Sequence, residues 1–454
     1  MSAPGINKRN TLILGCSGSV ACIKIPEIVD LIRACFPRLE IVVIPTTHAS
    51  HFLPKDGNGR VCLFSQQDRV QILDPCQSNT NFAGLMETVV AFLIAPLGAN
   101  LMAKLANPSF LQSANPSNLE LAVVRFLLHR QETPVPFLLA AAMNSMMWNS
   151  VVTENNLREI RSLYGSGRNC VVFIPTVDKP SMCGETGFGP MASPPDIVEY
   201  LQNTFIGSTV SDRRDIIVVP VPKNYDFTGK MSILDEGWSS QKACSHDAFN
   251  YRFDLCDLVT RESLNVLLSA DIESSLQLAV NSPEKFECDT KQRFVDAFMA
   301  DLRKCSMQCQ HSDNGEIQSV EKQVPRYNIK YITSDSVQKL SPEVRQVDQT
   351  VLDQQSFSDW DEWQVWSKRE DPVLHILLRQ WADILVLANP SALLISKITA
   401  GICDDLLTCV IRAWDYSRDT IFLCFTKASH DPLKGHSQQQ LRELQQRGIR
   451  VVWM

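Results

Sequence analysis

Short apolar runs alternate with longer segments of helical periodicity along the first half of the chain. The first run, residues 10–16, stops at a Gly/Ser turn, and residues 19–36 then place apolar side chains at helical spacing. Helical stretches separate most of the next four apolar runs, which are residues 39–47, 89–96, 134–143 and 169–175. Strands that alternate with helices predict an α/β fold whose parallel sheet is covered by helices on both faces.

The second half repeats this order less cleanly. Its expected strands are residues 213–222, 327–335, 382–390, 420–425 and 449–454. Ser, Asn, Asp, Gln and Glu dominate residues 223–325, which we interpret as an insertion, partly helical and partly disordered. The pattern therefore predicts two tandem Rossmann-like (flavodoxin-like) parallel-sheet domains, at residues 8–206 and 213–454, the second interrupted by that insertion.

Composition excludes several classes of partner. The chain has 454 residues, of which 44% are hydrophobic and 20% charged, and its net charge is −7. A mildly acidic chain gives no electrostatic reason to expect nucleic acid or a membrane surface as partner. No apolar run approaches the roughly twenty residues of a membrane-spanning helix, and no signal core opens the chain. We therefore expect a cytoplasmic protein.

The cysteines predict reduced thiols and no metal site. Fifteen cysteines are scattered along the chain, several of them in apolar runs, which is typical of buried free thiols. Cys305 and Cys309 lie at helical spacing with His311 nearby. No second ligand pair with suitable spacing follows them, so we predict no zinc site there.

The turn after the first expected strand is built of small residues. Gly18, Ser19 and Val20 lie where the strand passes into the helix. Small side chains let the backbone approach a phosphate, the helix start offers unpaired N–H groups, and the hydroxyls of Ser17 and Ser19 are further potential donors. A Gly/Ser turn between strand and helix is also common without any ligand, so this segment alone leaves both interpretations open.

Four longer strings carry a more specific signal. They are AAMNSMMW at 141–148, MCGETGFGPMA at 182–192, DPVLHILLRQWAD at 371–383 and GICDDLLTCVIRAWD at 401–415. All four resemble parts of the phosphopantothenoylcysteine decarboxylases and their halotolerance-protein relatives, which are flavin-dependent cysteine decarboxylases. In that family one domain carries histidine first, asparagine next and cysteine last. Here the histidine follows the cysteine, so the resemblance implies a degenerate tandem duplication.

The resemblance implies FMN as the cofactor, bound mainly by the first copy. Its Gly-Ser-Val loop, the end of its second strand and residues 95–107 are similar to the family's flavin-contacting segments. The implied FMN-binding residues are Gly18, Ser19, Val20, Thr46, Thr47, Gly98, Ala99, Asn100 and Ala142. In the second copy Asn389 and Leu393 replace the family's proline and asparagine in the third of these segments. That copy is therefore not expected to bind the flavin phosphate alone.

The same resemblance divides the catalytic residues between the copies. It assigns the substrate carboxylate to Asn144, a flexible flap to Cys183 and proton exchange to His375. The implied substrate-binding residues are Asn144, Met146, Trp148 and Gly184. Phe82 stands at the histidine position of the first copy and Ala428 at the asparagine position of the second. Two alternatives remain, a polar cap at a strand end for Asn144 and a buried structural thiol for Cys183.

The implied activity is FMN-dependent decarboxylation of 4′-phosphopantothenoyl-L-cysteine to 4′-phosphopantetheine, a step of coenzyme A biosynthesis. Family members form trimers with sites between protomers, so we expect a homo-oligomer, or a hetero-oligomer with a homologue, of the same trimer-type rings. The leading alternative is a non-catalytic regulatory protein of the halotolerance type, which inhibits a Ser/Thr protein phosphatase. A peptide-cysteine decarboxylase is less well supported, because Cys183 would then be superfluous.

Overall fold

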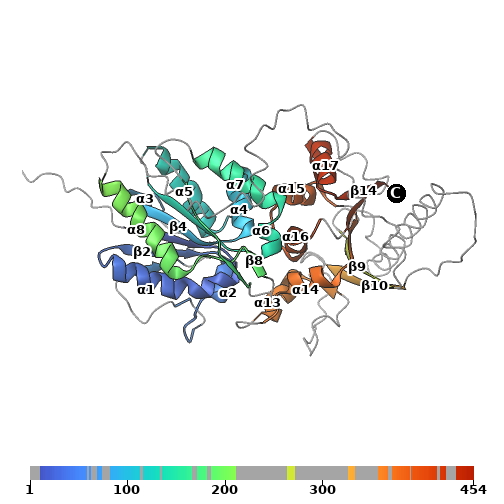
Figure 1. The fold of residues 1–454 in the computed structure, drawn as a ribbon, viewed down its shortest axis with the longest axis horizontal. Coiled ribbons are helices and arrows are strands. Elements are labelled where there is room, and N and C mark those ends of the chain that lie inside the picture. The colour runs from blue at the N-terminus through green and yellow to red at the C-terminus, as the bar shows by residue number, and fades with distance from the viewer. Residues whose placement is uncertain are drawn as a thin grey trace, which may run out of the picture. The chain divides into compact units, whose positions relative to one another are not determined.

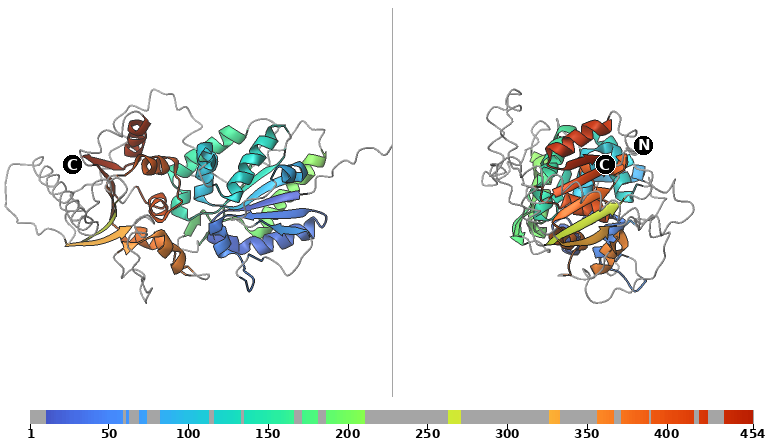
Figure 2. Two further views of the ribbon diagram at one scale, coloured as in Figure 1. Left: turned by 180° about the vertical axis from the view of Figure 1, so that it is seen from behind. Right: turned by 90° about the vertical axis from the view of Figure 1, so that its right-hand side faces the viewer.

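The computed structural model contains two six-stranded parallel sheets (Figures 1 and 2). The residues that the structure describes are 11–58, 61–62, 69–73, 82–112, 116–132, 135–165, 171–180, 186–210, 263–270, 326–332, 356–366, 371–388, 390–416, 420–425 and 436–453. Two compact units divide the chain, Met1–Tyr225 with Ala400–Ile402 and Asp226–Thr399 with Cys403–Met454. The predicted α/β class with tandem parallel sheets is confirmed, and the predicted domain limits stay predictions.

The first sheet has the strand order β3-β2-β1-β4-β5-β6. Its strands are β1 (Thr11–Cys16), β2 (Glu40–Pro45), β3 (Val70–Ile72), β4 (Val89–Leu97), β5 (Phe137–Ala141) and β6 (Val171–Ile174). All neighbouring pairs are parallel. All six residues of β1 are buried, as expected for a central strand that is covered on both faces.

Helices cover both faces of this sheet (Figure 1). The helical segments of the first unit are η1 (Val20–Lys24), α1 (Ile25–Cys35), α2 (Thr47–Phe52), α3 (Phe82–Thr88), α4 (Ala99–Ala106), η2 (Pro108–Gln112), α5 (Asn118–Glu132), α6 (Ser145–Trp148), α7 (Val151–Tyr164) and α8 (Pro194–Val210). α1 and α8 pack with Leu12 and Leu14 on one face, whereas α3, α4, α5 and α7 pack with Ile13 and Phe92 on the other. Alternate residues of β1 therefore contribute to two separate hydrophobic cores.

The strand order changes direction between β1 and β4, in the middle of the sheet. From β1 the chain moves outward through β2 to β3, and it then returns to the other side of β1 with β4. Connections leave β1 and β4 in opposite directions, and in open parallel sheets the carboxyl ends of two such strands border the ligand-binding crevice. The segments that follow β1, β2, β4 and β5 all reach this carboxyl edge.

The second sheet repeats the arrangement, with the order β11-β10-β9-β12-β13-β14. Its strands are β9 (Ser263–Ala270), β10 (Arg326–Ile332), β11 (Ser356–Phe357), β12 (Ile384–Ala388), β13 (Thr420–Phe425) and β14 (Arg450–Trp453). The described helices of this unit are α13 (Asp359–Val365), α14 (Leu374–Trp381), α15 (Ala392–Ala400), α16 (Leu406–Arg412) and α17 (His436–Gln446). α14 to α17 share one hydrophobic core with Leu385, Leu387 and Leu423.

The position of the first strand in this sheet corrects the sequence-based prediction. The strand expected at 213–222 lies outside the described residues. β9, which lies within the predicted insertion 223–325, occupies the corresponding place, because it pairs with β10 on one side and β12 on the other (Figure 2). Leu267 at its centre is buried. The segment interpreted as a partly helical and partly disordered insertion therefore contains a central strand of the sheet.

Among the described helices, none combines the length and the apolar character that crossing a bilayer requires.

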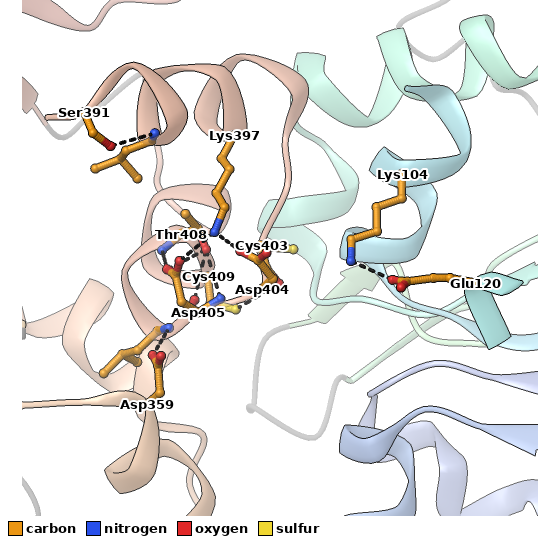
Figure 3. A network of polar contacts seen from close by, with 12 residues as sticks. Lys104, Glu120, Asp359, Ser391, Lys397, Cys403, Asp404, Asp405, Thr408 and Cys409 are labelled. Carbon is orange, nitrogen blue, oxygen red and sulfur yellow. Dashed lines mark hydrogen bonds and ion pairs between the residues drawn. The ribbon is translucent and has the colours of Figure 1, made fainter. Parts of the chain in front are cut away.

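An ion pair links α4 to the start of α5 in the first unit (Figure 3). Lys104 Nζ lies 2.6 Å from Glu120 Oε1, and the two side chains are 13% and 9% exposed. Glu120 Oε2 also accepts the backbone N–H of Ser117 at 2.8 Å. At the corresponding position of the second unit, Lys397 on α15 contacts Asp404 and Asp405. Both copies thus fix this helix with a lysine, although the acidic partners differ.

We expect Glu120→Ala to lower the free energy of unfolding by about 2–3 kcal/mol, because Lys104 then stays largely buried without its carboxylate and α5 loses a capping contact. Glu154→Ala is the matched control. Its pair with Arg158 is exposed, at 43% and 62%, so the expected loss is below about 0.5 kcal/mol. Urea unfolding of both variants measures the difference. Equal shifts of the midpoint would contradict a stabilising role for the buried pair.

Candidate functional site

Four helical segments begin at the carboxyl edge of the first sheet. Ser19 precedes η1, Thr46 precedes α2, Gly98 precedes α4 and Asn144 precedes α6, each shortly after a strand ends. The first N–H groups of a helix lack intrahelical partners and carry partial positive charge. Four such starts around one crevice form a setting that suits a phosphate or another anion.

Two of these segments are capped by hydroxyls. Ser19 Oγ accepts the N–H of Ala21 at 3.3 Å, and Thr46 Oγ1 accepts the N–H of Ala49 at 3.1 Å. A capping hydroxyl accepts from the helix and keeps its own hydrogen for donation. Ser19 and Thr46 are therefore suited to donate to an anion in the crevice.

Ser17 joins the two loops that border the crevice. Its Oγ accepts the N–H of Gly98 at 2.6 Å and donates to the carbonyl of Pro96 at 2.9 Å. Its hydroxyl hydrogen is thus committed, so Ser17 organises the crevice and is not the ligand donor that its position suggests. Cys22 Sγ donates to the Ser17 carbonyl at 3.2 Å, and burial raises the pKa of this thiol to about 12, which keeps it protonated.

Close backbone approach explains the glycines of these loops. A Cβ on Gly18 would lie 2.6 Å from Cβ of His48 on α2. A Cβ on Gly98 would lie 3.1 Å from Ser17 Oγ and 3.3 Å from the Gly18 carbonyl. The crevice keeps its shape only with hydrogen at both positions. The remaining predicted FMN-binding residues lie on the same segments, Val20 in η1, Thr47 in α2, Ala99 and Asn100 in α4 and Ala142 after β5.

Asn144 is both a helix cap and an oriented amide. Its Oδ1 accepts the N–H of Met147 at 2.8 Å, so the structure contains the polar cap considered as the alternative role. This bond also assigns the oxygen and nitrogen of the amide, since only the oxygen can accept. The cap therefore uses the amide oxygen and not the Nδ2 donor. Met146 and Trp148, two predicted substrate contacts, lie half-buried on α6.

A hairpin of β7 (Asp178–Pro180) and β8 (Thr186–Phe188) packs against the Asn144 turn. The N–H of Met143 donates to the carbonyl of Gly189 at 3.0 Å. Gly189 has φ of 139°, and a Cβ there would lie 2.7 Å from the Met143 carbonyl and 3.1 Å from that of Asn144. Only glycine suits this contact. Cys183 and Gly184 lie in sequence between the two strands, outside the described residues.

His375 is the second residue of α14 and contacts a carboxylate. Its Nδ1 lies 2.6 Å from Glu362 Oε1, and its backbone N–H donates to Glu362 Oε2 at 3.0 Å. The two side chains are 16% and 15% exposed. Glu362 lies on α13 and was not found by the sequence analysis. The available signal was the acidic segment Asp-Trp-Asp-Glu at residues 359–362, which precedes the histidine string.

The two units carry different residues at the family's histidine position and at its flavin-contacting asparagine position. Phe82, at the histidine position of the first unit, is the first residue of α3 and is buried in the hydrophobic core. Leu393, at the position of Asn100 in the second unit, is 61% exposed and offers no amide. Asn389, Ala428 and His430 lie outside the described residues. Each unit thus lacks a polar group that the other has.

Within the described residues, no group of three or more His, Cys, Asp or Glu side chains is placed to hold a metal ion. Cys305, Cys309 and His311 lie outside those residues.

The strand order and the carboxyl-edge crevice define a doubly wound α/β protein of the nucleotide-binding type. The family model described as Flavoprotein matches residues 2–206 and 317–453, and the chain belongs to that family. The second match begins after β9 and contains the remaining strands of the second sheet.

Curated relatives match over short segments. The phosphopantothenoylcysteine decarboxylase of Mus musculus is 54% identical over 66 residues, which are 14% of this chain and 32% of that protein. The Arabidopsis thaliana enzyme is 60% identical over 62 residues, 14% of this chain and 30% of that protein. Protein SIS2 of Candida tropicalis is 44% identical over 111 residues, 24% of this chain and 21% of that protein. The chain thus spans about a third or less of the length of these relatives.

Solved structures of the family also match. A cysteine-to-serine mutant of PPC decarboxylase complexed with pantothenoylaminoethenethiol aligns over 44% of this chain and 100% of that chain, with 24% identity and a TM-score of 0.34. The FMN binding protein AtHal3 aligns over 45% of this chain and 100% of that chain, with 24% identity and a TM-score of 0.32.

Proposed function

We propose that this protein catalyses FMN-dependent decarboxylation of 4′-phosphopantothenoyl-L-cysteine to 4′-phosphopantetheine, with a composite active site. Asn144 and Cys183 come from the first copy and His375 from the second. One observation carries the proposal. The first copy has the oriented amide and the hairpin but a buried Phe82 at the histidine position, whereas the second has a histidine held by a carboxylate.

FMN fits the crevice of the first sheet. The helix starts after Ser19, Thr46 and Gly98 would hold its phosphate, and the close loops at Gly18 and Gly98 would let the backbone approach it. Ala99, Asn100 and Ala142 would border the ring and the ribityl chain. When bound, FMN would supply a two-electron oxidation of the carbon that bears the substrate thiol, which provides an electron sink for the loss of carbon dioxide, and it would return the two electrons to form the saturated product.

Asn144 would hold the carboxylate that is lost. Its cap on α6 fixes the amide, and the Nδ2 group would donate to the carboxylate. A neutral amide suits this task, because it binds the carboxylate without neutralising the charge that must leave as carbon dioxide. A lysine or arginine would instead stabilise the ground state.

His375 and Cys183 would move protons. The ring of His375 contacts the Glu362 carboxylate at Nδ1, which leaves Nε2 as the ring nitrogen that would take up or release a proton. Cys183 would donate the proton that completes the saturated product. The hairpin strands that flank Cys183 in sequence pack against the Asn144 turn, which supports this role.

The assembly would be a homo-oligomer, or a hetero-oligomer with a homologue, in trimer-type rings, since neither copy holds the complete catalytic set. A regulatory subunit of a protein phosphatase has no need of Asn144, of the flap or of a carboxylate-bound histidine. Their retention favours catalysis over that role.

Cys183→Ser tests the proposed reaction. We expect the wild-type chain to release carbon dioxide and to form 4′-phosphopantetheine in equal amounts. The serine variant should still release carbon dioxide but should accumulate the unsaturated thiol, because a hydroxyl is a much weaker acid than a thiol and does not complete the reduction. Mass spectrometry of the products measures this. Normal formation of 4′-phosphopantetheine by the variant would remove Cys183 from the proposal.

A further inference from the structure

We propose that Glu362 is a positioning residue for His375, holding its imidazole in the Nδ1–H tautomer so that Nε2 faces the substrate. The assignment of a substrate to that nitrogen rests on the proposed function. The position of the ring and its tautomer rest on the geometry of the second unit alone.

One carboxylate contacts both the ring and the backbone of His375. Oε1 of Glu362 lies 2.6 Å from Nδ1, and Oε2 accepts the backbone N–H at 3.0 Å. Two contacts from one rigid group fix the ring relative to the start of α14. Both side chains are largely buried, so competition from water is reduced.

The helix that carries Glu362 is itself held in place. Asp361 accepts the N–H and the hydroxyl of the buried Ser358, both at 2.7 Å, which closes the start of α13. Asp359 accepts the N–H of Leu406 at the start of α16 at 2.6 Å, a contact seen in Figure 3. α13 is therefore anchored at its own start and to a second helix, and its carboxylates have fixed positions.

A purely structural role for Glu362 explains only half of this geometry. Capping α14 needs one oxygen on the backbone N–H of His375. The second oxygen instead contacts Nδ1, one of only two ring nitrogens, at a distance typical of a charge-assisted hydrogen bond. A structural cap does not require that contact.

The contact with Glu362 determines which nitrogen of the His375 ring carries the hydrogen. An ionised carboxylate only accepts hydrogen bonds, so Nδ1 must carry the hydrogen. In the neutral ring Nε2 then has the lone pair and can accept a proton. When it does, the positive ring lies against the negative carboxylate, which is already in position.

The test uses the full-length protein labelled with ¹⁵N-histidine, without substrate. The chain has eight histidines, and the signals missing from His375→Ala identify those of His375. We expect the wild-type ring to carry hydrogen on Nδ1. In Glu362→Gln the amide can donate as well as accept, so we expect a mixture of tautomers. Glu443→Gln is the control, because it makes the same change of carboxylate to amide in the same unit, at a residue that pairs with Arg447 and not with His375, and it should leave the tautomer unchanged.

Turnover supplies the second measurement. We expect Glu362→Gln to lower kcat by about 10–100-fold while KM changes little, and Glu443→Gln to stay within about threefold of the wild type. A wild-type His375 with its hydrogen on Nε2 would overturn the proposal, even if Glu362→Gln fails to fold. An identical tautomer in wild type and Glu362→Gln would also overturn it. A wild type that shows the Nδ1–H tautomer but no turnover would contradict the proposed function and leave the positioning intact.

Discussion

Replacing His375 with alanine is expected to lower turnover by about 10²–10⁴-fold, the usual contribution of a positioned acid or base. The backbone N–H of residue 375 can still donate to Glu362, and the side chain is at the start of α14, so no large core cavity forms. Flavin content and the unfolding curve should therefore stay close to those of the wild type. Turnover at the wild-type rate would contradict the shared active site.

Asn144→Asp is expected to lower turnover by about 10²–10³-fold, because it replaces the Nδ2 donor with a negative oxygen that repels the substrate carboxylate. Aspartate is a good helix cap, so its other oxygen can still accept the N–H of Met147 and α6 should form normally. The variant thus separates the amide donor from the cap. Asn144→Ala, which removes both, serves as the comparison.

Co-expression of His375→Ala and Asn144→Asp then shows whether active sites form within one chain or between chains. If sites form between chains, some interfaces combine an intact Asn144 with an intact His375, and part of the turnover returns. If sites form within one chain, every site has one defect and no turnover returns. Affinity tags of two kinds on the two variants allow the mixed assembly to be purified and assayed.

Gly18→Val is expected to weaken FMN binding by about 10–100-fold and to give protein that loses its yellow colour during purification. The new Cβ would lie 2.6 Å from Cβ of His48, which is fixed to the backbone of α2 and cannot swing away. Relieving such a clash typically costs about 1–3 kcal/mol, and here it displaces the loop that would approach the phosphate.

Gly57→Val is the matched control for this change. Gly57 lies in an exposed turn, and a Cβ there would have no atom within 4 Å. We expect full flavin content from this variant, measured as flavin absorbance per mole of protein. Full flavin content in Gly18→Val would contradict the position of the phosphate, and colourless, folded wild-type protein would contradict the FMN assignment.

The central strands of the first sheet could be predicted because consecutive residues in them are buried and therefore apolar. All six residues of β1 are buried, and such a strand needs an unbroken apolar run. The edge strands β3 and β11 have three and two residues, and each pairs with a single neighbour, so no comparable run marks them. β9 is different again, because a short apolar run within polar sequence becomes a central strand only through pairing with β10 and β12.

In the candidate site, too, the sequence predicted some features and the structure was needed for others. The residue types at Gly18, Asn144 and His375, together with their order along the chain, were sufficient to suggest a flavoprotein and a division between two copies. Sequence alone left Asn144 undecided between cap and substrate contact. The hydrogen bond from Met147 shows that Asn144 is a helix cap, and the substrate contact stays a prediction.

What the sequence by itself determined is the succession of buried strands and the small or polar residues that follow them, because both depend on near neighbours in the chain. Only the tertiary structure decided which groups meet across longer separations. Glu362 precedes His375 by thirteen positions, and no periodicity of a single element relates them. Their contact arises where α13 packs beside α14, and the chemistry of the histidine depends on that packing.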